Sequence, residues 1–145
     1  MSQNFATIRS ITDNLESVCT KLGIKFARET FDDIDAIPAS LLPHGQIFYE
    51  GEDFEYAFGQ KPEYATANFR LQVVLKVGGD SRENIRNQQK WVHEIRDGLT
   101  VNALNITDLA TTKYISMVKV EGVEAVNAVA KSSLNVKVAI KYREI

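Results

Sequence analysis

Four carboxylates gather in one short stretch and form the densest group of residues suited to proton-transfer chemistry: Glu50, Glu52, Asp53 and Glu55. Two carboxylates act as general acid and general base only where one of them is desolvated, so that their pKa values separate. Here they crowd Glu50–Asp53, a glycine-containing segment between two strand-like runs, Gln46–Tyr49 and Phe54–Phe58. That pattern predicts the exposed turn of a β-hairpin. We interpret the stretch as a solvated hairpin end or an acidic contact surface, and not as a catalytic pair.

The other residues with reactive or metal-binding side chains form no recognisable site. His93 falls on the polar side of a predicted helix and His44 in a Pro-His-Gly turn, and neither has a second ligand at suitable spacing. Cys19 flanks an apolar helical stripe and is predicted to be a core residue. The acidic run Asp32–Asp35 lacks the glycine and the terminal glutamate of a calcium loop, and Ile37 stands where a ligand is needed. The sequence therefore predicts no enzyme site, no metal and no cofactor.

A weakly apolar segment, Gly122–Ser132, is too long for a tight hairpin loop. Its only charged residues are Glu124 and Lys131. Exposed apolar segments often mark partner sites, so we take three valines as candidate contacts: Val123, Val126 and Val129. The alternative is a hairpin extension that packs on its own subunit.

The segment Leu134–Arg143 alternates apolar and polar residues, which is typical of a strand with one buried face. Three basic residues lie on its outward face: Lys137, Lys141 and Arg143. A solvated strand face is the simpler interpretation, and contact with an acidic partner surface is the alternative.

Two helices and several strands are predicted to share one core. Ser2–Leu22 carries an apolar stripe, and the strand Tyr64–Val77 leads through the N-cap residue Asp80 into an amphipathic helix, Ser81–Leu99. The strand Lys113–Glu121 is partly apolar on both faces, which predicts a central position or a covering partner. The expected fold is a single α+β domain with a mixed, largely antiparallel sheet and both helices on one face.

Length and charge narrow the class of protein further. A chain of 145 residues buries roughly 70% of its unfolded surface. The net charge of -2 and the pI near 5.7 argue against a dedicated nucleic-acid binder. One cysteine fits a reducing compartment, and the sequence has neither a signal peptide nor an apolar run that could span a bilayer. We expect a soluble protein of the cytoplasm.

The order of these elements carries a resemblance over nearly the whole chain. It runs from the N-terminal helix through the loop Ile37–Pro43, the two short strands, the strand–helix pair Phe69–Leu99 and the two closing strands. This order resembles the tail terminator proteins of long-tailed bacteriophages. The resemblance implies a sheet with helices on one face and a homo-oligomeric ring, most often a hexamer, that caps the tail tube and joins it to the head-side connector. It implies neither catalysis nor a cofactor.

The resemblance also sets the expected partners and location. They are further copies of the chain, the tail tube protein, a head-side connector or stopper protein and a sheath protein, in the neck of a virion assembled in the host cytoplasm. Within the ring, the acidic stretch, the three valines and the basic strand face are the candidate contacts, which meet head to tail as unlike patches. Two alternatives stay open: another connector or minor tail protein, and a small ferredoxin-like enzyme. An enzyme would pair a cleft with a titratable group of perturbed pKa.

Overall fold

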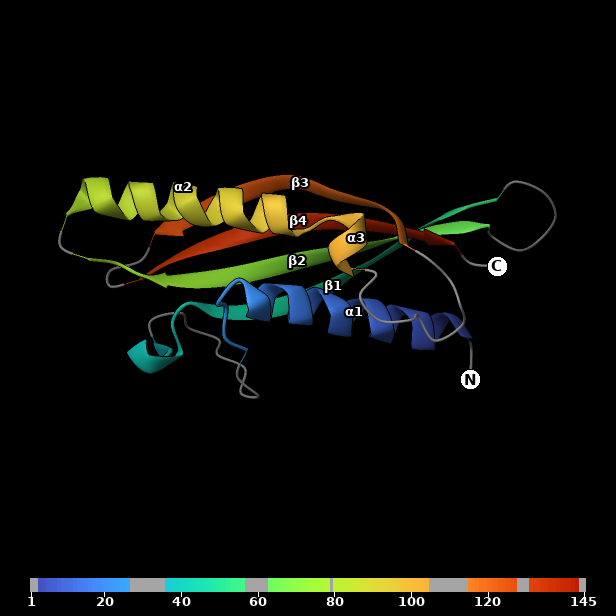
Figure 1. Ribbon diagram of the computed structural model, residues 1–145, viewed down its shortest axis with the longest axis horizontal. Helices are drawn as coiled ribbons and strands as arrows, with labels where there is room; N and C mark the ends of the chain where they lie inside the picture. Colours follow the sequence, from blue (N-terminus) through green and yellow to red (C-terminus); the bar gives the residue numbers. More distant parts are fainter. Residues whose placement is uncertain are drawn as a thin grey trace.

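The computed structural model describes residues 3–26, 36–56, 63–78, 80–104, 115–127 and 131–143. Their elements are α1 (Gln3–Lys21), the short 3-10 helix η2 (Ala39–Leu41), β1 (His44–Glu55), β2 (Tyr64–Lys76), α2 (Ser81–Gly98), α3 (Val101–Leu104), β3 (Ile115–Asn127) and β4 (Lys131–Arg143). The strands form one sheet in the order β1-β2-β4-β3, and every neighbouring pair is antiparallel. Figure 1 shows this long, twisted sheet with its helices. The expected α+β class is confirmed.

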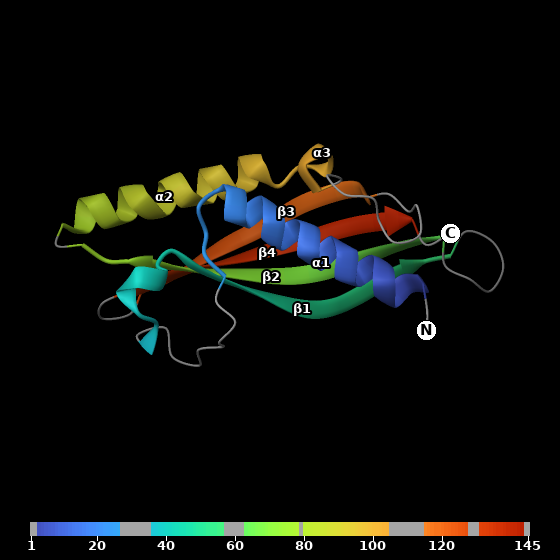
Figure 2. The ribbon, with the colours of Figure 1, turned by 60° about the horizontal axis from the view of Figure 1, so that its bottom comes forward.

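Alternation along the two central strands places the core on one side of the sheet. In β2, every second side chain from Ala65 to Val73 is buried, and β4 buries the matching set from Leu134 to Tyr142. Both sets belong to one apolar cluster with Leu15 of α1 and Ile95 of α2. The two long helices therefore pack on the same face, as predicted. Figure 2 shows α2 running alongside β3 while α1 crosses the sheet next to it.

The predicted N-cap at Asp80 is confirmed. The Asp80 carboxylate accepts a hydrogen bond from the Arg82 backbone N–H at 2.9 Å and caps α2. Gly23 follows α1 with a φ of 100°, a conformation suited to ending a helix. The apolar side chain of Ile85, in the first turns of α2, does not join the core and is 53% exposed.

The predicted hairpin around Gly51 is wrong. β1 is one strand that pairs with β2 from His44↔Val74 to Glu55↔Tyr64. The register shifts between Tyr49 and Glu52, and Gly51 adopts a φ of 103° there. A glycine with positive φ inserts an extra residue as a β-bulge without reversing the chain. The four acidic residues therefore lie along an edge strand and not at a hairpin tip.

The predicted loop Gly122–Ser132 is also wrong over its described residues. β3 continues to Asn127, and the pairing with β4 extends to Asn127↔Ser132. β3 is an edge strand and not a central one. Its register shifts twice, after Ile115 and after Val120, and these bulges change which side chains face the helices.

Candidate interaction surface

The face of the sheet opposite the helices carries mainly polar and charged side chains, and we call it the open face. Strand pairing places these residues on it: Gln46, Phe48, Asp53 and Glu55 of β1, Thr66, Asn68, Arg70 and Gln72 of β2, Asn135, Lys137, Lys141 and Arg143 of β4, and Met117, Lys119, Glu124 and Val126 of β3. Every strand of the sheet contributes to this surface. Its character follows from the polar half of each alternating pattern.

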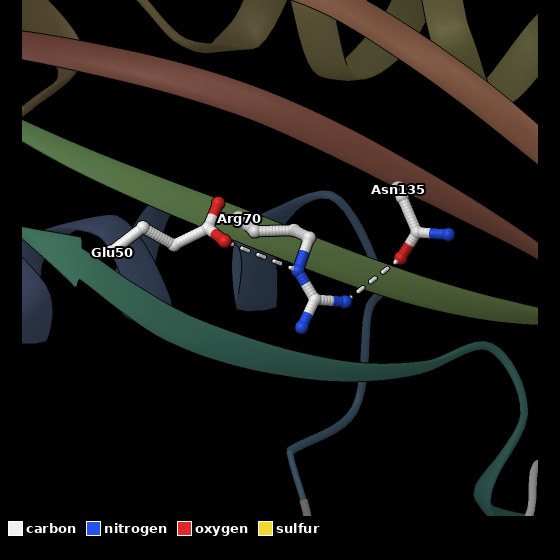
Figure 3. Close-up of polar contacts among 3 residues, drawn as sticks. All are labelled: Glu50, Arg70 and Asn135. Atoms are coloured by element: carbon white, nitrogen blue, oxygen red, sulfur yellow. Dashed lines mark hydrogen bonds and ion pairs between the residues drawn. The ribbon is translucent and has the colours of Figure 1, made fainter.

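Arg70 lies at the centre of the open face and links three strands. Its Nε lies 3.7 Å from the Glu50 carboxylate of β1, and its Nη1 donates to Asn135 Oδ1 of β4 at 3.2 Å. Figure 3 shows the guanidinium between these two groups. The same guanidinium lies 4.2 Å from the centroid of the Phe48 ring, a cation–π contact. Because the Arg70 and Glu50 side chains are 33% and 45% exposed, the ion pair adds at most about 1 kcal/mol.

A second set of contacts joins β1 to β4 across β2. Lys141 Nζ lies 2.8 Å from the Glu55 carboxylate and 4.9 Å from the centroid of the Tyr64 ring. Asn68 Nδ2 donates to the Asp53 carboxylate at 3.1 Å. One residue of the predicted acidic patch, Glu55, and one of the predicted basic patch, Lys141, thus meet within one chain. This cross-strand pairing leaves them less free to meet a partner.

Glu52 differs from Asp53 and Glu55, because the bulge places its side chain on the helix side of the sheet. Its carboxylate accepts hydrogen bonds from Tyr142 Oη at 2.5 Å and from Tyr49 Oη at 2.8 Å. Burial, the hydrogen bond to Glu52 and the charge of that carboxylate raise the pKa of Tyr49 to about 12. The four carboxylates therefore have separate partners on two faces of the sheet.

The rest of the candidate set divides between two strands. Lys137 and Arg143 are exposed on β4, and neither forms an ion pair with the described residues. Val123 of β3 is half-buried against the core, whereas Val126 is 42% exposed on the open face. Val129 lies outside the described residues.

Two hollows border β3, one on each face of the sheet. On the open face, a hollow of about 430 Å³ is lined by Arg70, Glu121, Gly122, Val123, Glu124, Asn135 and Lys137. On the helix side, a groove of about 310 Å³ between α2 and β3 is lined by Ile85, Gln88, Gln89, Val92, His93, Val123, Ala125 and Leu134. We call the second one the α2–β3 groove. The first hollow has a charged lining, and the groove has a more apolar one.

Cys19 and His44 lie away from both hollows, whereas His93 lines the α2–β3 groove. Cys19 is fully buried, and burial, with a smaller effect from the charge of Glu16, raises the pKa of its thiol to about 12. Burial lowers the pKa of His44. His93 is exposed, and its Nδ1 lies 3.1 Å from Arg96 Nη2. The acidic run Asp32–Asp35 lies outside the described residues.

Within the described part of the chain, no group of three or more His, Cys, Asp or Glu side chains could hold a metal ion. No described helix is both long and apolar enough to cross a bilayer. Neither the family models nor the curated proteins searched contain a match to this chain.

Sequence reasoning placed Arg70 on the polar side of its strand but did not identify it as the centre of a contact network. Its partners are distant in sequence, since Glu50 and Asn135 come from β1 and β4. The signal that was present is the alternation of β2 and β4, which puts Arg70 and Asn135 on one face. The missing information is the strand order and register, which decide that these residues are neighbours.

Proposed function

We propose that this protein is a tail terminator of a long-tailed bacteriophage: a homo-oligomeric ring, a hexamer by the resemblance, that caps the tail tube and joins it to the head-side connector. The observation that carries the proposal is the arrangement of the elements. A helix, two long strands, a second helix and two further long strands follow in this order, and both helices pack on one face of the sheet. This is the layered domain that the resemblance implies.

The distribution of polar groups supports an assembly role. Charged and amide side chains from all four strands lie on the open face and offer hydrogen-bonding and electrostatic contacts, as polar interface rims do. Cys19 and His44 are buried, and burial raises the pKa of the thiol to about 12 and lowers the pKa of the imidazole, which suits a packing role for both side chains. We propose that the protein has no catalytic role.

The decisive experiment is high-resolution imaging of the head–tail junction in the particle whose genome encodes this chain. We expect a ring of copies at the upper end of the tail tube, in contact with both the tube and the connector. A ring that touches only the connector would indicate a stopper instead. A single copy, or a position elsewhere in the virion, would refute the proposal.

A further inference from the structure

The sheet ends in two long edge strands, β1 on one side and β3 on the other. They contain 12 and 13 residues. Lys25 forms a parallel bridge with His44 at the start of β1, and no other described strand pairs with the outer side of either edge. Long edges with free backbone groups are prone to pair with another chain.

We propose that the β1 edge of one copy pairs antiparallel with the β3 edge of the next, so that one sheet continues from subunit to subunit. The inference rests on the proposed ring and names the contact that builds it. Neighbouring strands are antiparallel throughout the four-stranded sheet, so β1 and β3 run in opposite directions. A head-to-tail copy keeps its orientation, and its β1 therefore meets β3 in the antiparallel sense. Such heterologous contacts close into rings when the rotation allows it.

The bulges of the two edges match in register. When Tyr49 is placed opposite Val123 in an antiparallel pair, Glu52 falls opposite Val120 and Phe54 opposite Val118. β1 has its register shift between Tyr49 and Glu52, and β3 has one just after Val120. In both strands, the alternation of side chains between the two faces of the sheet thus shifts by one residue at the same place. Side chains that face the helices on β1 meet side chains that face the helices on β3 on both sides of the bulge, as a continuous sheet requires.

The helix-side surfaces of the two edges are complementary in shape and polarity. On β1, Tyr49 and Phe54 face the helix side and are 54% and 49% exposed. On β3, the α2–β3 groove presents Val123 together with Ile85 of α2. An incoming β1 strand places Tyr49 beside this groove, where an aromatic side chain supplies the desolvated area of an anchor residue. A strand added along an edge beside a helix is a common recognition geometry.

The open-face charges agree with the same register. It places Asp53 of one copy opposite Lys119 of the next. Lys119 is exposed and has no ion pair among the described residues. Asp53 is exposed, and its carboxylate accepts a hydrogen bond from the neutral amide of Asn68. Unlike charges directly opposite each other stabilise a strand pair and help to fix its register.

The test introduces Asp53→Cys and Lys119→Cys into one chain. Within a subunit these positions lie on opposite edges, about 14 Å apart across three strand spacings, which is too far for a disulfide. Oxidation of assembled particles carrying this variant should give a ladder of multimers on a non-reducing gel. Each single variant should give no ladder beyond a dimer. The matched register control combines Asp53→Cys with Met117→Cys, two residues along the same face, and should lose the ladder.

Charge reversal keeps the inference testable if the cysteine variant does not assemble. Asp53→Lys alone and Lys119→Glu alone should each reduce ring formation, and the double variant should restore it. The edge pairing would be wrong, and the proposed function intact, if rings form but the variant with Asp53→Cys and Lys119→Cys gives no cross-link and the double charge reversal gives no rescue. A cross-linked ladder from a protein that is absent from the tail end would support the edge pairing and overturn the function.

Discussion

Gly51→Ala is expected to lower the free energy of unfolding by about 1–2 kcal/mol, the usual cost of a side chain in the left-handed region. Gly51 has a φ of 103°, and a Cβ added there would meet no atom within 4 Å. The cost therefore comes from the backbone alone, with no contribution from a clash. Gly51→Asn should recover part of it, because asparagine tolerates positive φ better than alanine.

Gly122→Ala provides the matched control in the same sheet. A Cβ at Gly122 also meets nothing within 4 Å, and the backbone there does not have the positive φ of Gly51. Alanine at this position should leave stability unchanged or raise it by up to about 1 kcal/mol, because the unfolded chain loses freedom. Urea unfolding followed by circular dichroism measures both free energies, with m expected to be unchanged. Equal stability of the two variants would refute the bulge assignment of Gly51.

Three further predictions concern the core, the Tyr49 phenol and the Cys19 thiol. Leu15→Ala or Ile95→Ala, both fully buried, should each cost about 2–5 kcal/mol in urea unfolding, and a midpoint equal to that of the wild type would contradict their core position. Tyr49→Phe should remove one phenol that titrates near pH 12 in absorbance spectra. Because the pKa of this phenol in the folded chain lies above the ordinary value of 10.0, the stability that it adds is fully present below pH 10.0 and is lost as the pH rises toward 12. Cys19 should react with a thiol reagent only after unfolding, and rapid labelling of the native chain would contradict its burial.

Periodicity was sufficient for the elements whose alternation is unbroken. β2 and β4 pair over their full length without a register shift, and their alternating residues were assigned to the correct faces. The helices were also correct, because the stripe of α1 and the cap at Asp80 are local features of the sequence. In each case the information that defines the element lies within the element itself.

The two edge strands were mispredicted for a common physical reason. A bulge shifts the alternation by one residue, and the pattern then resembles the end of one strand and the start of another. At Gly51 the glycine and the flanking carboxylates added the composition of a turn. After Val120 the phase change concealed that Val123 and Ala125 continue the same strand. Only the partner strand, β2 or β4, shows that the residues on both sides of the bulge belong to one strand, because it pairs with both.

The same register decides which charges are available for assembly. The sequence offered Glu55 and Lys141 as halves of two complementary patches, yet they form an ion pair of 2.8 Å within one chain. Charges used in this way hold β1 to the central strands and add little to a contact between subunits. On the open face, a neighbour can still use Lys137 and Arg143, which form no ion pair among the described residues. At the edges of the sheet it can use Lys119, which likewise has no ion pair among them, and the half-exposed side chains of Tyr49 and Phe54. A strand added at an edge also gains backbone hydrogen bonds, which contacts between side-chain patches do not supply. Assembly through the edges therefore leaves the ion pair between Glu55 and Lys141 in place and adds backbone hydrogen bonds to the contact.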